Sequence, residues 1–448
     1  MRCLVGSIFV VALGVMGCNE TSPNMCEGVD CDDNNECTYD VCDPATGTCE
    51  HFGNCDCVDC NDDNECTDDA CDLTTGMCTN RPFDDGTDCG DGAGTCQAGS
   101  CMGTFACTEQ GIRDAIAIGG GPHTFACVGP TIVVTEAEIV IDKDVVLDGE
   151  GDLIVDGDED HRVFSVPQGV TAKLRRFVVT NGSLPVNENG GGILNHGILT
   201  LTSTAVSKNS AYGGGGIANL DGATLTMTNC TVSGNTAVGA GGIWNEASRG
   251  SPNSTLTMIN STVSGNTAEY DGGLSNGQLG TVTMINCTVT GNTGTDGVGG
   301  IWNYVHATLT MINCTVTDNT TADRADIVNF NTLSVANSLI EGDCSSRQPI
   351  ESTGHNIESP GDTCGFDPDG TDQVNVSADD LNLGELADNG GPTMTHKPGD
   401  GGFGDDSTAI DAIPGDACEV TEDQRGEPRP ETGGTLCDVG AVEVQPAQ

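Results

Sequence analysis

The sequence predicts an all-β protein built on a right-handed parallel β-helix, with a disulfide-rich module before the helix and a loop-rich cap after it. The prediction rests on three patterns that recur about every two dozen residues. An aliphatic residue is followed two positions later by Asn at Ile193/Asn195, Ile217/Asn219, Ile243/Asn245, Leu274/Asn276, Ile301/Asn303 and Ile327/Asn329. Val precedes Asn by three positions at Val206, Val232, Val263, Val289 and Val316, and Leu-Thr-Leu or Leu-Thr-Met begins at Leu199, Leu225, Leu256 and Leu309. Three short strands per repeat cannot bury a core alone, but stacked coils can.

Residues 1–17 have the features of an export signal. A basic start is followed by an apolar stretch that is too short to span a bilayer. Val15-Met16-Gly17-Cys18 resembles the box of bacterial lipoprotein signals, which implies that Cys18 is lipidated and becomes the mature N-terminus. In such proteins Asn19 favours the outer membrane. We expect an exported protein with its lipid at Cys18 in the outer membrane or cell surface and a linker over 18–25; an ordinary cleaved secretory signal is the alternative.

The chain is strongly acidic, with 67 Asp and Glu against 15 Lys and Arg and a formal net charge of −52. A polyanionic partner would be repelled by this charge. Nucleic acid is therefore excluded as a partner. The same acidity is compatible with calcium binding or with a solvated extracellular surface.

Residues 26–106 form the expected cysteine-rich module. Cys31, Cys37, Cys42 and Cys49 repeat their spacing 29 residues later in Cys60, Cys66, Cys71 and Cys78. Such short segments hold too few apolar residues for a core, so disulfides must order them, in a connectivity that the sequence does not give. The text resembles the Asp/Asn-rich cysteine repeats of bacterial surface proteins, which implies a stalk or binding module and no catalysis.

The same repeats carry oxygen ligands of the kind that a hard cation requires. The candidate calcium ligands are Asp33, Asn35, Asp40, Asp62, Asn64 and Asp68. An acidic, disulfide-stapled spacer without an ion is the alternative. Calcium is the one candidate cofactor, and no cofactor is required by the predicted function.

Residues 107–343 are expected to form a capping helix and the β-helix. Thr108 is a plausible N-cap for an amphipathic helix that covers the first coil, and Cys107 and Cys127 are candidates for a disulfide that ties it down. Residues two apart on a strand share a face, so the Asn that follows each buried aliphatic residue also points inward. The Asn side chains are therefore expected to form internal hydrogen-bonded ladders.

The position between the aliphatic residue and Asn points outward and holds both tryptophans of the chain, Trp244 and Trp302, two coils or ~10 Å apart. Tyr212, Tyr270 and Tyr304 are expected near the same edge. Exposed aromatic faces bind sugars and partner proteins, so these five residues form the candidate ligand-binding stripe. The alternative is that Trp covers a glycine-rich edge that has few side chains of its own.

The Gly-Gly-Ile-x-Asn and Asn-x-Thr-Val-x-Gly-Asn text over residues 190–331 resembles the repeats of polymorphic outer-membrane proteins. That resemblance implies surface display and adhesion. A lyase would require a basic residue beside acidic calcium ligands, and a hydrolase would require two or three carboxylates at catalytic separation. In the central coils the fixed cations Lys208, Arg249 and Arg324 fall in different registers, so no catalytic residues are assigned.

Residues 344–448 are expected to form a C-terminal cap. The motifs at 388–393, 409–412, 423–426 and 437–441 closely resemble, in order, the C-terminal signature of bacterial choice-of-anchor Q proteins. Members are exported β-helix proteins held to the cell by differing devices, commonly a C-terminal tail; this sequence ends without such a tail, which makes Cys18 the expected anchor. Disulfides Cys344–Cys364 and Cys418–Cys437 are expected to close loops over the last coil, and Asp411, Asp423, Arg425 and Asp438 are expected to form ion pairs and turn caps.

These features together predict a cell-surface lipoprotein whose β-helix is a non-catalytic binding or adhesion scaffold. The expected partners are the membrane, through the N-terminal lipid, and a glycan or a cell-surface protein. A β-helix polysaccharide lyase or hydrolase is the alternative function. A purely structural envelope protein is the third.

Overall fold

The computed structural model describes residues 29–31, 38–43, 45–46, 48–53, 60, 66–71, 77–89, 94–185, 187–321, 326–368, 370–402 and 406–445. The expected export signal, Cys18 and the linker lie outside these residues. The chain divides into two compact units, Met1–Phe83 and Asp84–Gln448. Of the helices in the described ranges, none has the length and apolar character of a membrane span.

In its described residues, the first unit contains two antiparallel hairpins with the same covalent pattern. β1 (Thr38–Cys42) pairs with β2 (Cys49–Gly53), and β3 (Thr67–Cys71) pairs with β4 (Cys78–Pro82). Disulfides join Cys31 to Cys49 and Cys60 to Cys78, each across 18 residues. The 29-residue repeat of the sequence is therefore a repeat of one disulfide-linked hairpin.

The second unit begins with β5 (Asp88–Cys89), β6 (Gly94–Gln97) and β7 (Ser100–Ala106). These strands form an antiparallel meander stapled by Cys89–Cys101. β7 then pairs in parallel with β8 (Gly120–Ala126). Residues 84–106 thus belong to the β-helix unit, whereas the cysteine pattern had placed the module boundary at residue 106. The difference arises because β7 hydrogen-bonds to the first rung of the helix.

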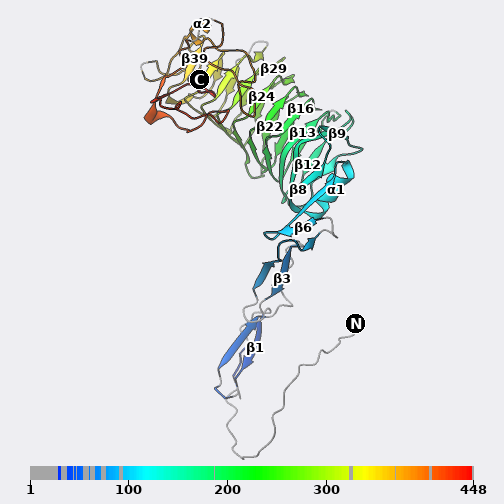
Figure 1. Ribbon diagram of the computed structural model, residues 1–448. Coiled ribbons are helices and arrows are strands. Elements are labelled where there is room, and N and C mark those ends of the chain that lie inside the picture. The colour runs from blue at the N-terminus through cyan, green and yellow to red at the C-terminus, as the bar shows by residue number, and fades with distance from the viewer. Residues whose placement is uncertain are drawn as a thin grey trace, which may run out of the picture. The chain divides into compact units, whose positions relative to one another are not determined.

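The helix α1 (Glu109–Ile118) caps the first coil, as the sequence predicts (Figure 1). The Thr108 side chain accepts a hydrogen bond from the Gly111 amide, and Ile112, Ala115 and Ile116 are buried. Cys107 and Cys127 form the disulfide expected at the ends of this cap, with a Cα–Cα distance of 5.0 Å. The apolar face of α1 and one covalent link therefore close this end of the helix.

Parallel pairing between successive coils builds the β-helix, confirming the predicted fold (Figure 1). The first ladder contains β10 (Ile139–Val140), β12 (Phe164–Val166), β14 (Ile193–Asn195), β18 (Ile217–Leu220), β22 (Ile243–Glu246), β26 (Leu274–Asn276), β30 (Ile301–Asn303), β34 (Ile327–Asn329) and β37 (Cys344–Ser346). The second ladder contains β8, β11 (Val145–Asp156), β13 (Thr171–Thr180), β15 (Ile198–Thr202), β19 (Thr224–Thr228), β23 (Ser254–Ile259), β27 (Gly280–Ile285), β31 (Thr308–Ile312), β35 (Thr332–Ala336) and β38 (Glu351–Gly354).

The third ladder continues from the ends of β11 and β13. It contains β9 (Thr131–Val134), β16 (Ala205–Ser207), β20 (Thr231–Ser233), β24 (Thr262–Ser264), β28 (Thr288–Thr290), β32 (Thr315–Thr317), β36 (Leu339–Glu341) and β39 (Ile357–Ser359). A fourth ladder was not predicted, because its strands are two residues long: β17 (Ser210–Ala211), β21 (Thr236–Ala237), β25 (Thr267–Ala268), β29 (Thr293–Gly294) and β33 (Thr320–Thr321). Strands this short show no alternation from which a period can be read.

Two Asn ladders run inside the helix, as predicted. Asn195, Asn219, Asn245, Asn276, Asn303 and Asn329 are all fully buried, and each Nδ2 donates to the next Oδ1 at 2.7–2.9 Å. Asn209, Asn235, Asn266, Asn292 and Asn319 form the second ladder with distances of 2.9–3.0 Å. Buried amides that satisfy one another cost little to bury and fix the register of successive coils. At one corner of the helix, Cys230, Cys287 and Cys314 are buried and free.

A third set of Asn residues, not predicted, turns the corner between the second and third ladders. Asn229, Asn260, Asn286, Asn313 and Asn337 each have φ between 49° and 56°. This left-handed conformation is unfavourable for most side chains but is tolerated by Asn. Each of these Asn residues directly precedes a buried Cys or Ser at the corner. Asn recurs there because the backbone adopts the left-handed conformation at that position.

The C-terminal module contains α2 (Ala378–Leu381), the short helix η3 (Gly415–Ala417) and the antiparallel pair β40 (Ile413–Pro414) and β41 (Leu436–Cys437). Cys344–Cys364 and Cys418–Cys437 are bonded, which are the pairs expected from the sequence. The module covers more than the last coil. Hydroxyls of Thr262, Thr288 and Thr315, on three successive coils of the third ladder, bond to Met394, Gln424 and Ala441. The outward Thr residues of this ladder thus hold the cap along the side of the helix.

Candidate aromatic binding site

Three consecutive rungs of the first ladder, β22, β26 and β30, form the candidate site. Their strand register aligns Trp244 with Ser275 and Ser275 with Trp302. Asn245, Asn276 and Asn303 on the same strands point into the core. The inward ladder therefore fixes the outward direction of both tryptophans, which lie two rungs or ~10 Å apart.

The surface of the middle rung, β26, is recessed because its outward-facing residues are small. Ser275 lies between Trp244 and Trp302, and Gly277 follows it on the same face. The flanking rungs carry large side chains at these positions, so the surface is hollowed between them. The hollow has a volume of about 380 Å³, which lies in the range of small-molecule sites. We call it the aromatic hollow.

All five aromatic residues predicted as a ligand-binding stripe line the aromatic hollow. Trp244 and Trp302 are half-buried, while Tyr212, Tyr270 and Tyr304 are 38%, 46% and 42% exposed. Gly239, Ala240 and Asp271 complete the lining from the turns that precede the first-ladder strands. The residues converge because these turns and strands stack coil on coil.

Two glycines allow the side chains of Trp244 and Glu246, which line the aromatic hollow, to pack directly on the backbone. A Cβ added at Gly213 would sit 2.0 Å from Cε3 of Trp244, so one face of this indole rests directly on the glycine backbone. A Cβ at Gly277 would sit 2.8 Å from Cβ of Glu246, so the Glu246 side chain leans across Gly277. Trp244 does cover a glycine, as the alternative interpretation expected, and it also borders the aromatic hollow.

Trp302 is held by a small aromatic cluster. Its ring centroid lies 6.1 Å from that of Tyr304 and 5.5 Å from that of Phe330, the latter in an edge-to-face arrangement. Val298 and Val328 are buried beneath this group. Trp302 therefore presents a fixed ring to the aromatic hollow, which lowers the entropic cost of binding a ligand against it.

Two acidic residues, Glu246 and Asp271, also line the aromatic hollow and were not assigned from the sequence. Burial raises the pKa of Glu246, while hydrogen bonds from the Gln278 backbone and the Trp244 side chain oppose this shift. At the rim, the Glu269 carboxylate raises the pKa of the Tyr270 hydroxyl. Glu246 lies two residues after Trp244 on the same strand, and this spacing was the available signal. Asp271 follows no strand pattern, because it precedes the Gly-Gly turn.

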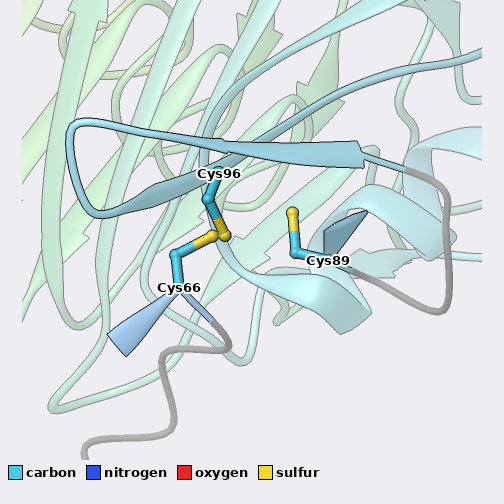
Figure 2. A group of neighbouring side chains, drawn as sticks. All are labelled: Cys66, Cys89 and Cys96. Atoms are coloured by element: carbon cyan, nitrogen blue, oxygen red, sulfur yellow. The ribbon is translucent and has the colours of Figure 1, made fainter. Parts of the chain in front are cut away.

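The other predicted site residues are not brought into this site. Of the candidate calcium ligands, Asp33, Asn35, Asp62 and Asn64 lie outside the described residues, as does the Asp40 side chain, and Asp68 is exposed. Cys66, Cys89 and Cys96, drawn in Figure 2, are each disulfide-bonded. These three sulfurs therefore offer no thiolate to a metal ion.

The acidic cluster of the C-terminal module serves the fold. The Asp423 carboxylate accepts hydrogen bonds from the Arg425 side chain and from the backbone amides of Arg425, Glu427 and Glu443. Asp438 accepts from the Asp411 and Val444 amides, and burial raises its pKa to about 6. These contacts are the ion pairs and turn caps that the sequence predicted for these residues.

A comparison with known protein families finds a match in the cysteine-rich repeats. The model of the Dictyostelium (slime mold) repeat matches residues 30–51 and 59–82. These two matches start 29 residues apart, which is the period of the cysteine pattern. Both matches lie within the first unit, and neither extends into the β-helix.

The β-helix resembles a solved structure at low similarity. The crystal structure of pectate lyase Pel9A is 14% identical, covers 73% of this chain and 90% of its own, and gives a TM-score of 0.40. Such a resemblance carries no argument about activity, and the fold rests on the strand registers above. No curated protein matches the chain.

Proposed function

We propose that the protein is a cell-surface binding protein whose β-helix holds a glycan in the aromatic hollow without cleaving it. The observation that carries the proposal is the set of three rungs in which Trp244 and Trp302 flank Ser275. Two aromatic faces ~10 Å apart match the length of a disaccharide, so each ring can stack on one sugar of a chain. Glu246, Asp271 and the tyrosine hydroxyls supply partners for sugar hydroxyls beside those faces.

The decisive variants remove the rings or fill the space between them. Trp244→Ala combined with Trp302→Ala should abolish binding on a glycan array and in calorimetry. Ser275→Phe should do the same by occupying the aromatic hollow while leaving both tryptophans in place. Leu194→Ala is the matched control, because Leu194 occupies the same outward column two rungs before Trp244. Glycan binding that survives both treatments would refute the proposal.

The melting temperature separates binding from shielding. Removing Trp244 uncovers Gly213, and removing Trp302 loosens the cluster with Phe330, so a modest loss of stability is expected in the double variant. If the double variant loses binding only because it unfolds, the tryptophans serve to cover the glycine-rich edge rather than to bind a ligand. Ser275→Phe resolves the two roles, because it blocks the aromatic hollow without uncovering the glycine.

We place the protein on the outer membrane or cell surface through lipid at Cys18. The support is the lipoprotein box and the ordered C-terminal motifs that resemble choice-of-anchor Q proteins. Metabolic labelling with a fatty-acid analogue should mark the wild type, and Cys18→Ser should lose the label and leave the membrane fraction. Membrane retention of Cys18→Ser would contradict this anchor.

A second candidate function is glycoside hydrolysis. The observation that favours it is a pair of acidic residues, Glu246 and Asp271, in one aromatic hollow, with the pKa of Glu246 raised by burial. A carboxyl group with a raised pKa suits a general acid, and a second carboxylate suits a base or nucleophile. Reducing-sugar release from a polysaccharide panel, lost in Glu246→Gln, would replace the binding proposal by this one.

A further inference from the structure

We propose that the aromatic hollow selects cationic amino-sugar chains, such as β-1,4-linked glucosamine oligomers, over neutral and acidic glycans. This inference rests on the proposed glycan-binding function and adds the charge class of the ligand. The juxtaposition that carries it is a set of aromatic faces and two carboxyl groups in one concave site. A site for an acidic glycan such as a polyuronate would require the opposite charge.

The lining is acidic in a consistent way. Among the described residues that border the aromatic hollow there is no Lys, Arg or His, while Glu246 and Asp271 both contribute to it. Glu269 and Asp296 act electrostatically on Tyr270 at the rim. An ammonium group on a bound sugar would therefore meet negative charge on more than one side.

The walls suit the same cation. A protonated amine within about 6 Å of an indole or phenol ring is attracted by the ring face, and desolvation strengthens the attraction. Trp244 and Trp302 are half-buried, and Glu246 is partly withdrawn from water beside them. A charge pair in such a site is screened less than one at an open surface.

Among the described residues, Arg347 is the cation that stacks on this aromatic cluster. The Arg347 guanidinium lies 4.3 Å from the ring centroid of Phe330, which does not line the aromatic hollow. This cation is thus paired with a ring that lies outside the lining of the aromatic hollow. Acidic glycans would meet the two carboxyl groups directly, on a chain whose formal net charge is −52.

The two tryptophans provide a specific readout, because they are the only ones in the chain and both border the aromatic hollow. Intrinsic fluorescence of the intact protein is titrated with a glucosamine tetramer, its N-acetylated counterpart and tetragalacturonate, at a pH where the sugar amines are protonated. Calorimetry repeats the titrations. We expect the glucosamine tetramer to bind at least about tenfold more tightly than the N-acetylated tetramer, and we expect this preference to shrink as salt is added.

Charge variants assign the preference to the site. Glu246→Gln retains an oxygen that accepts the bonds from Trp244 and Gln278, and it should lower the preference; adding Asp271→Asn should bring the ratio close to 1. The control is Asp142→Asn with Glu159→Gln, which removes the same total charge from exposed positions on earlier coils. The control should leave the ratio unchanged.

Each outcome is decisive. Equal or tighter binding of the N-acetylated or acidic tetramer overturns the charge selectivity and leaves glycan binding standing. A preference that persists in Glu246→Gln with Asp271→Asn, or that falls equally in the control, also overturns it. If no saccharide changes the tryptophan signal or produces heat, the proposed glycan function itself fails.

Discussion

Removing one amide from the first Asn ladder should destabilise the β-helix by an amount that its contacts allow us to estimate. Asn245 Oδ1 accepts from Asn219 Nδ2 at 2.8 Å, and Asn245 Nδ2 donates to Asn276 Oδ1 at 2.9 Å. In Asn245→Ala the Asn219 amide keeps the Thr255 carbonyl as a partner at 3.0 Å, whereas Asn276 Oδ1 loses the ladder donor in a fully buried position. One lost bond costs about 0.5–1.5 kcal/mol and one orphaned buried acceptor about 1–3 kcal/mol, so the expected loss is about 2–4 kcal/mol.

Urea unfolding followed by far-ultraviolet circular dichroism, with the disulfides intact, measures this loss as a shift of the midpoint. Asn253→Ala is the matched control, because Asn253 is exposed in the turn before the following second-ladder strand. We expect the control to stay within about 0.5 kcal/mol of the wild type. If Asn245→Ala unfolds at the same urea concentration as Asn253→Ala, the ladder bonds contribute nothing net and our account of the interior is refuted.

Two further predictions concern pH and calcium. Burial raises the pKa of Asp326 from an ordinary 3.8 to about 7, so the folded state holds this proton more tightly than the unfolded state and stability falls as the pH rises from about 4 to about 7. Asp326→Asn should therefore be about 2–4 kcal/mol more stable than the wild type at pH 8, and its stability should lack this part of the pH dependence. The control Asp142→Asn should not differ from the wild type. If Asp326→Asn and the wild type show the same dependence of stability on pH, the raised pKa of Asp326 is contradicted. If the cysteine-rich repeats bind calcium, millimolar calcium should raise the melting temperature of the intact protein and Asp62→Asn should weaken the effect, whereas an unchanged melting temperature would exclude the ion.

The interior of the β-helix was predictable because stacking imposes one requirement on every coil. A residue such as Ile243 must meet the same neighbours above and below, and Asn245 must find an amide in both directions, so the residues recur at each rung. A residue type recurs along the sequence at the positions whose side chains contact the equivalent residue of the next coil. This explains why the internal Asn ladders could be predicted from the sequence.

The remaining fold features depend on contacts between unlike segments. β7 pairs with β8 across α1, and the C-terminal module bonds to Thr262, Thr288 and Thr315 from residues more than a hundred positions away. The sequence shows that Thr recurs on the third ladder. It does not show whether a given Thr hydroxyl faces solvent or forms a hydrogen bond with the C-terminal module. Long-range partners of this kind leave no period.

The candidate site lies where the outward residues depart from uniformity. Trp244 and Trp302 were identified because they share a column, but the aromatic hollow exists because Ser275 and Gly277 interrupt that column between them. A third large residue on the middle rung would give a continuous aromatic ridge without space for a ligand ring. Since the inward Asn ladder fixes the register regardless of what lies outside, the outward positions are free to vary from coil to coil. We therefore expect ligand selectivity at the aromatic hollow to depend as much on the small residue of one rung as on the aromatic residues beside it.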